Sequence, residues 1–359
     1  MSKDKKANSA CQSRLGTVGG QAVMEGVMMK SRSDMAVAVR NDKGDIVVRT
    51  KKVVQAKDKH KFLGWPLIRG VVNFAETLVL SYSTLMSSVE MSGLDEMETE
   101  TKFDKWIDKH FGKKILTAVG VLGGVLGVAI AVLLFMYVPM WIANLIKDNV
   151  VALSKPMYAL VEGAVKITLF IAYLFAVSLM KDIRRVFMYH GAEHKSIFCY
   201  EKGLELTVEN VKAQKRFHPR CGTSFIFVLL ALSIIAGSFI PNDIGAWRVL
   251  CKLAVIIPIV GIGYEFIRYA GKHENIVTRV LSAPGLWMQR ITTKEPDESM
   301  MEVAIVSIKS ALRDEFPDFE IPYEKKEEKT EEASGEKAGE TAETPADAPS
   351  GGENDDDDR

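Results

Sequence analysis

The sequence lacks several features that define familiar protein classes. Lysine plus arginine equals aspartate plus glutamate, at 46 each, so no basic excess indicates a nucleic-acid partner. Cysteine is scarce, with four residues in 359, which argues against a disulfide-stapled fold. The polar start of the chain, residues 1–14, is not followed by an apolar core, so we expect no signal peptide.

Charge is nearly absent from four long apolar segments, and this absence decides the fold class. The segments are residues 115–146, 157–180, 224–240 and 249–264. Only Glu162, Lys166 and Lys252 interrupt them. Runs of about 18 or more apolar residues are typical of membrane-spanning helices. We therefore predict a mainly α, polytopic helical membrane protein with about four transmembrane helices, and an i,i+4 ion pair between Glu162 and Lys166.

The distribution of positive charge predicts how these helices are oriented. Nine lysines and arginines lie in residues 181–223, whereas the other two connections between apolar segments carry two and one. By the positive-inside rule, we expect a multi-pass protein of the cell membrane with both termini and residues 181–223 in the cytoplasm. Cys11, Cys199 and Cys221 then lie on the side where thiols stay reduced.

The first apolar segment is long and rich in glycine. Its 32 residues would extend about 48 Å as a helix, against a hydrocarbon core of about 30 Å, so we expect a tilt or a kink at Pro139. Gly120, Gly123, Gly124 and Gly127 form two overlapping Gly-x-x-x-Gly pairs. Such pairs let helices approach closely, either within the chain or in a homo-oligomer. Membrane lipids are the other expected partners.

Outside the membrane segments, the sequence predicts a small β-containing cap and several cytoplasmic helices. Alternating valines at 35–40 and 45–50 flank a turn-rich stretch and are typical of a β-hairpin. The amphipathic residues 62–89 favour an interfacial helix over a fifth span, and Pro284 is expected to break the chain. The predicted organisation is a disordered start at 1–15, a cap at 16–60, an amphipathic helix and charged linker at 61–114, a membrane domain at 115–270, a cytoplasmic helical segment at 271–323 and a disordered acidic tail at 324–359.

One stretch carries the spacing His-x-x-Glu-His, at His190, Glu193 and His194. In a helix the two histidines lie one turn, about 6 Å, apart on one face, which is the spacing that two imidazoles need to share a metal ion. Glu193 could act as general base toward a metal-bound water, or as a third ligand. The alternative is a pair of exposed histidines on a solvated helix face, because short motifs give false positives.

The stretch from His218 to Cys221 is the best source of a further ligand, because it lies on the same predicted membrane face as the motif. His218 and Cys221 are both good ligands for a divalent metal ion such as zinc. The alternative is that Pro219 shapes a turn into the membrane and leaves His218 exposed. Arg220 could hold an anionic substrate or a lipid phosphate.

Five further side chains are candidates for substrate contact or for support of the metal ligands. They are Gln21, Glu25, Glu201, Glu265 and Arg268. Glu201 lies roughly 10 Å beyond His194 along a straight helix, so it orients an imidazole unless the helix breaks. Gln21 and Glu25 fall in a glycine-rich stretch that could instead be a buried turn and short strand. Glu265 and Arg268 could instead form an i,i+3 ion pair at the membrane surface.

Four motifs, taken together and in this order, resemble the YqhQ-like family of bacterial membrane proteins. The motifs are residues 19–29, 189–195, 218–224 and 292–297, and the resemblance covers roughly residues 12–315. That family is a domain of unknown function described as predicted metal-dependent enzymes. The resemblance therefore implies a metal site at the His-x-x-Glu-His stretch without indicating a reaction.

Three functions are compatible with these patterns. The first is a membrane-embedded metal-dependent hydrolase, in which His190 and His194 hold zinc, His218 or Cys221 completes the site and Glu193 activates water. The second is a binding or assembly protein with a structural metal, whose four protein ligands leave no open position. The third, a transporter, is disfavoured because the sequence shows no clear midplane charge site and no obvious inverted repeat.

Overall fold

The computed structural model describes residues 14–53, 61–93, 122–241, 247–270 and 275–323. The predicted acidic tail, the predicted charged linker and most of the predicted disordered start lie outside this part of the chain. The strands are β1 (Gly19–Val23), β2 (Gly26–Lys30), β3 (Asp34–Arg40) and β4 (Ile46–Lys52). The helices named in the text are α3 (Ile68–Ser92), α6 (Val138–Asn149), α7 (Lys155–Ser178), α8 (Lys181–Glu201), α9 (Val208–Lys212), α10 (Gly222–Gly237), α11 (Trp247–Ala270), α12 (Ile276–Thr292) and α13 (Glu298–Ala311).

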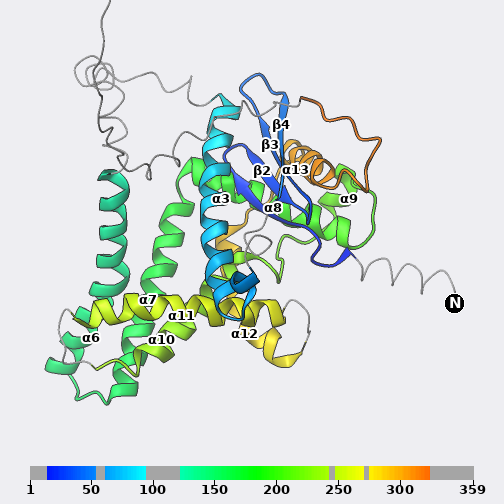
Figure 1. The fold of residues 1–359 in the computed structure, drawn as a ribbon. Coiled ribbons are helices and arrows are strands. Elements are labelled where there is room, and N and C mark those ends of the chain that lie inside the picture. Colours follow the sequence, from blue (N-terminus) through cyan, green and yellow to red (C-terminus); the bar gives the residue numbers. More distant parts are fainter. Residues whose placement is uncertain (1–13, 54–60, 94–121, 242–246, 271–274, 324–359) are drawn as a thin grey trace, which may run out of the picture. The chain divides into compact units, whose positions relative to one another are not determined.

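The four strands form one antiparallel sheet in the order β1-β2-β3-β4 (Figure 1). The predicted hairpin is confirmed as β3 and β4, in which Arg40 pairs with Ile46. The glycine-rich stretch before it forms a second hairpin, β1–β2, rather than one short strand. Its turn is two residues long, so that Val23 pairs with Gly26, and Glu25 in this turn has a positive φ of 50°.

Helices cover both faces of the sheet. Side chains alternate along β3, so Ala36 and Ala38 pack with α8 and α13, whereas Val37 and Val39 pack toward α3. Both sets are buried, which explains why β3 is apolar along almost its whole length. The sheet and α13 therefore fix the position of α8, the helix that carries the His-x-x-Glu-His spacing.

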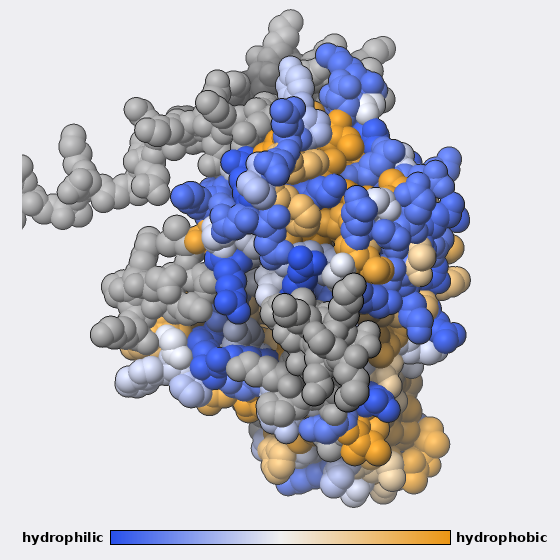
Figure 2. Space-filling model, turned by 90° about the vertical axis from the view of Figure 1, so that its right-hand side faces the viewer, coloured by the Kyte–Doolittle hydropathy of each residue, from blue (hydrophilic) through white to orange (hydrophobic). Residues whose placement is uncertain are grey.

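Three described helices are long and apolar enough to cross a membrane. They are Leu122–Asn149, Lys155–Ser178 and Trp247–Ala270. The fourth predicted span corresponds to α10, whose 16 residues reach about 24 Å and fall short of a hydrocarbon core of roughly 30 Å. Figure 2 shows one group of hydrophobic side chains at the lower right of the visible face and another among the hydrophilic side chains of its upper half.

The first of these helices departs from regular α geometry near the predicted kink. A π-helical turn, Leu133–Tyr137, directly precedes α6, and Pro139 lies in the first turn of α6. Proline has no backbone N–H to donate, so a locally widened turn accommodates it. The glycines of this helix that the structure describes face open space, because a Cβ added at Gly123, Gly124 or Gly127 would meet no atom within 4 Å.

Helix α3 is not among the three candidate spans, and it packs on α11. The contact is close because Gly70 has no side chain: a Cβ there would lie 3.0 Å from the Cα of Gly261. Arg69 adds a bidentate ion pair to Glu265, with distances of 2.6 Å and 2.5 Å. Glu265 therefore stabilises the α3–α11 contact, and the expected i,i+3 pair with Arg268 is replaced by this longer-range one.

Helix α12 also differs from the prediction, because it continues through Pro284 instead of breaking there. Its first turn is fixed by a capping box, in which the Asn275 side chain accepts from the Thr278 N–H and the Thr278 hydroxyl accepts from the Asn275 N–H. The helix is therefore established well before the proline is reached.

The charges buried between α7 and α11 are paired differently from the sequence prediction. Glu162 pairs with Lys252 and with Arg248, whose Nη2 lies 3.1 Å from the Glu162 carboxylate, rather than with Lys166. Arg248 is 1% exposed and also lies 4.7 Å from the centre of the Tyr158 ring. One carboxylate thus balances two cations among apolar helices.

We expect Glu162→Gln to destabilise the protein strongly. The substitution keeps the shape of the side chain but leaves two buried cations without their counter-charge, and losing one partner of a buried ion pair costs roughly 3–5 kcal/mol. Thermal unfolding of detergent-purified protein should show a large fall in Tm. Glu205→Gln, at an exposed carboxylate between α8 and α9, is the matched control. Equal Tm values for the two variants would contradict the role of Glu162.

Candidate metal centre

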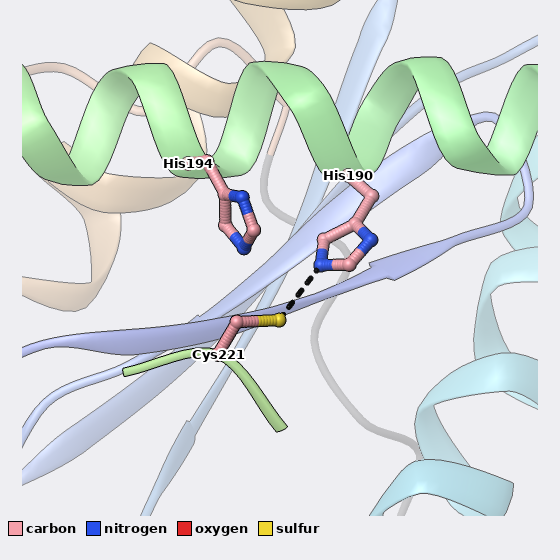
Figure 3. A group of neighbouring side chains, drawn as sticks. All are labelled: His190, His194 and Cys221. Atoms are coloured by element: carbon pink, nitrogen blue, oxygen red, sulfur yellow. Dashed lines mark hydrogen bonds between the residues drawn. The ribbon is translucent and has the colours of Figure 1, made fainter. Parts of the chain in front are cut away.

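Helix α8 brings two imidazoles together on one face. It runs unbroken from Lys181 to Glu201, and the ring centroids of His190 and His194 are 4.4 Å apart. Cys221, the residue that precedes α10, faces them, and its Sγ lies 3.3 Å from His190 Nε2 (Figure 3). One donor atom from each of the three residues lies within 4.8 Å of the other two. We call these side chains the His-His-Cys cluster.

The backbone fixes which nitrogen of each ring carries the proton. His190 Nδ1 lies 2.9 Å from the carbonyl oxygen of Thr292, and His194 Nδ1 is hydrogen-bonded to the carbonyl oxygen of Arg216. A carbonyl only accepts, so each Nδ1–H donates and each neutral ring keeps an unprotonated Nε2. Burial lowers the pKa of His194 and so favours its neutral form. An imidazole held in this way is ready to bind a metal through Nε2.

The donor set fits zinc. Zinc binds imidazole nitrogen and thiolate sulfur at about 2.0–2.3 Å, which places the donor atoms of a tetrahedral site roughly 3.3–3.8 Å apart. The contact between His190 and Cys221 already has that length, and every other separation in the cluster is at most 4.8 Å, so it contracts by no more than about 1.5 Å on metal binding. Three protein donors leave a fourth position, as in catalytic zinc sites.

Glu193 lies beside the cluster with its carboxylate buried. Its Oε2 is 4.0 Å from His190 Nε2, and the backbone of Gly20 in β1 packs against the same side chain. Burial raises the pKa of Glu193 to about 7, although His190 and the Gly20 N–H oppose the shift. Gly20 has to be glycine for this approach, because a Cβ there would lie 2.8 Å from Glu193 Cγ. The edge strand of the sheet thus closes one side of the site.

The segment after α12 crosses α8 at the level of the motif. Gly191 allows this crossing, because a Cβ at that position would lie only 2.1 Å from the carbonyl oxygen of Lys294. The N–H of Lys294 donates to the carbonyl of Phe187 at 2.8 Å, and Lys195 pairs with Glu295. These contacts hold the preceding Thr292 carbonyl against His190.

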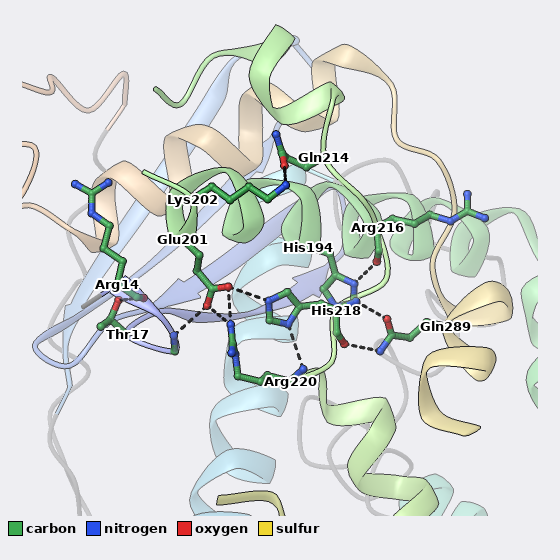
Figure 4. A network of polar contacts seen from close by, with 11 residues as sticks. Arg14, Thr17, His194, Glu201, Lys202, Gln214, Arg216, His218, Arg220 and Gln289 are labelled. Carbon is green, nitrogen blue, oxygen red and sulfur yellow. Dashed lines mark hydrogen bonds and ion pairs between the residues drawn. The ribbon is translucent and has the colours of Figure 1, made fainter. Parts of the chain in front are cut away.

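His218 is not part of the cluster but belongs to a neighbouring polar network (Figure 4). Its Nε2 lies 3.4 Å from Glu201 and its Nδ1 accepts from the backbone N–H of Arg220 at 3.3 Å, so both ring nitrogens are engaged. Arg220 Nη2 also donates to both oxygens of Glu201 at 2.6 Å. Burial alone would raise the pKa of Glu201, but His218, the Gly16 N–H and Arg220 together lower it. This network stabilises the turn that leads into Cys221.

The structure also places the remaining candidate residues. Gln21 accepts a hydrogen bond from Ser81 in α3 at 2.7 Å. Glu25 forms a bidentate ion pair with Arg185 in α8 and lies 3.4 Å from the hydroxyl of Tyr189. Both residues therefore attach the first hairpin to helices, and the cluster itself does not include them. Arg268 lies in the last turn of α11, outside the cluster.

Sequence reasoning missed the groups that make the site specific. The two carbonyl oxygens, of Thr292 and Arg216, belong to the backbone and leave no signature in the side chains. Gly20 and Gly191 matter because their lack of a side chain lets Glu193 and Lys294 approach closely, and a glycine in a sequence does not show which atom approaches it. The sequence pointed to the Thr292 carbonyl only indirectly, because residues 292–297 form one of the four motifs of the family resemblance.

Comparison with known proteins bears on the family and not on the reaction. Residues 65–314 match the family model described as "Protein of unknown function (DUF1385)". The chain belongs to this family. One relative, "Uncharacterized protein YqhQ" from Bacillus subtilis (strain 168), is 35% identical over 296 residues, which is 82% of this chain and 92% of the relative. No solved structure matches the chain. The DUF1385 match contains the whole His-His-Cys cluster, Glu193 and Thr292, and it confirms the predicted YqhQ-like family.

Proposed function

We propose that this DUF1385 protein is an integral membrane, metal-dependent hydrolase that binds zinc at the His-His-Cys cluster. The observation that carries the proposal is the fixed tautomer of both imidazoles. Each Nδ1–H is held by a backbone carbonyl, which leaves the Nε2 atoms of His190 and His194 unprotonated and facing the thiol of Cys221. Histidines on a solvated helix face do not need two such carbonyls, whereas metal ligands do.

Glu193 is the group that would handle the proton in hydrolysis. Zinc held by His190, His194 and Cys221 would supply Lewis acidity toward a substrate carbonyl or phosphoryl oxygen. The Glu193 carboxylate lies 4.0 Å from His190 Nε2, so it is near enough to accept a proton from the attacking water and to return it to the leaving group. Gly20 packs closely against this side chain from the edge strand.

A structural metal site is the alternative that a specific observation favours. Here Glu193, and not His218, would be the fourth protein ligand, because both ring nitrogens of His218 are engaged by Glu201 and Arg220. A set of two histidines, one cysteine and one glutamate would leave no open position. The two functions therefore differ in whether Glu193 binds the metal or the water.

Cobalt substitution tests whether the metal has an open position. Wild-type protein loaded with cobalt should show a thiolate-to-cobalt band, which Cys221→Ser should lose. Cys199→Ser is the matched control, because that buried thiol donates to the Glu205 carbonyl and lies outside the cluster. Azide should change the visible cobalt spectrum if the fourth position is open. A spectrum that saturating azide leaves unchanged would favour the structural site and contradict the hydrolase.

The proposal includes a topology and partners. We propose that the protein is a multi-pass protein of the cell membrane with both termini and the cluster on the cytoplasmic side, supported by the lysines and arginines of residues 181–223. Termini on the same side need an even number of crossings, so α10 would cross as a fourth, shorter span beside the three candidate spans. Membrane lipids are the proposed partners of the three candidate spans. The open glycine face at Gly123, Gly124 and Gly127 is where a second copy of the chain would pack.

A further inference from the structure

A cavity of about 300 Å³ adjoins the His-His-Cys cluster. Its walls come from four places: the turn that contains Arg220 and Cys221, α10, the last turns of α11, and α12. Cys221 belongs to both features, since it lines the cavity and its Sγ lies 3.3 Å from His190 Nε2. A molecule in the cavity therefore reaches the cluster at one end.

The walls of the cavity are divided by polarity. Val228, Phe266 and Leu286 form an apolar part, whereas Arg220 and Arg279 bring positive charge. The two arginines are not equivalent, because Arg220 is already bound to Glu201 by two 2.6 Å contacts. Arg279 is exposed, and no carboxylate among the described residues lies within ion-pairing distance of it. Among the residues that the structure describes, the unbalanced charge of this cavity is therefore that of Arg279.

The surroundings of α12 are those of a helix at an apolar boundary. Ile276, Val280 and Trp287 are 79%, 63% and 52% exposed, on the same helix that presents Arg279 to the cavity. Exposed apolar residues, a tryptophan and arginine on one helix are typical of an interfacial position in a membrane. A ligand that enters beside α12 would therefore come from, or partition into, an apolar phase.

We infer that the cavity binds an amphiphile with a phosphate headgroup, the phosphate at Arg279 and the aliphatic part along Val228, Phe266 and Leu286. The volume equals that of about ten water molecules at roughly 30 Å³ each, so it holds a headgroup and a short piece of one chain. This inference rests on the proposed function for its chemistry: the bond to be hydrolysed is the one beside Cys221.

Binding of octyl phosphate to the full-length protein in phosphatidylcholine nanodiscs tests the inference by calorimetry. Wild type should bind it saturably, and Arg279→Gln should bind it about tenfold more weakly, because a charge-assisted contact is lost. Arg290→Gln, at an exposed arginine in the last turn of the same helix, should behave as wild type. Equal affinity of wild type and Arg279→Gln, or the absence of saturable binding, would overturn the inference.

Two comparisons identify the ligand chemistry. Inorganic phosphate should bind more weakly than octyl phosphate, and equally tight binding of the two would show that the apolar wall takes no part and overturn the amphiphile. Nanodiscs that contain phosphatidic acid assign the source. If phosphatidic acid in the nanodisc competes with octyl phosphate for the cavity, the ligand is a bilayer lipid; if it does not compete, the ligand is a soluble amphiphile. Both results support a phosphate amphiphile.

The same assay separates this inference from the proposed function. Protein with both His190→Ala and His194→Ala should still bind octyl phosphate, because Arg279 and the apolar wall are intact. Wild-type protein that binds octyl phosphate but no zinc would sink the hydrolase and leave the cavity assignment standing. Wild-type protein that binds zinc but no octyl phosphate would overturn the cavity assignment and leave the hydrolase proposal standing.

Discussion

Replacing His190 and His194 by alanine should lower the zinc content of the purified protein from about one ion per chain to a trace. The two imidazoles supply two of the three donors in the cluster, and a single cysteine thiolate does not hold zinc against dialysis. In the neutral rings both Nε2 atoms are unprotonated, so a metal ion binds there without a change of tautomer. Elemental analysis by mass spectrometry after dialysis against metal-free buffer gives the measurement.

The control for this experiment is His218→Gln. Glutamine can still donate to Glu201, and His218 lies outside the cluster, so this variant should retain wild-type zinc content. Its circular dichroism and Tm report whether the turn before Cys221 is intact. Equal zinc in wild type and in the double alanine variant would end the case for a metal at this site.

Glu193→Gln should keep zinc and lose turnover by about 10²–10⁴-fold, because general base catalysis typically contributes that much. The amide has the shape of the carboxylate but cannot accept a proton. Zinc content and hydrolysis of a phosphate or carboxylic ester are measured on the same sample. A Glu193→Gln protein that loses its zinc would show that the carboxylate is a ligand, and the structural alternative would then hold.

The pH dependence of turnover has a definite sign. A general base works in its ionised form, so turnover should rise with pH through the pKa of Glu193. Burial raises that pKa to about 7 in the metal-free site, and a bound cation lowers it. The pH at which turnover reaches half of its rise should therefore lie below about 7 in the zinc-loaded enzyme. The residual activity of Glu193→Gln should lack this rise, and a variant that keeps it would assign the titration to another group.

Local sequence patterns predicted the elements that carry the site. The four-residue spacing of His190 and His194 depends only on helix geometry, and the helix is continuous as expected. Alternating valines predicted the β3–β4 hairpin for the same reason, because the period of a strand is local. Cys221 was predicted as one of two candidate ligands, and only the structure brings it, rather than His218, to the histidines.

Pairings between distant residues could not be predicted in this way. Glu162 binds Arg248 and Lys252, which are 86 and 90 residues away, although Lys166 has the better local spacing. Arg69 and Glu265 form a similar long-range pair, although 196 residues separate them along the chain. One sequence shows which charges are buried among apolar residues, but not which helix lies opposite.

The distance along the chain between the parts of the cluster bears on how the protein is made. Cys221 follows His190 by 31 residues, and Thr292 follows it by 102, with α10 and α11 in between. A ribosome therefore releases both imidazoles long before the carbonyl that orients the first of them. If the proposed metal centre forms, its loading would wait until these helices are inserted and α12 has been translated, which would make maturation of the centre a late step of biogenesis.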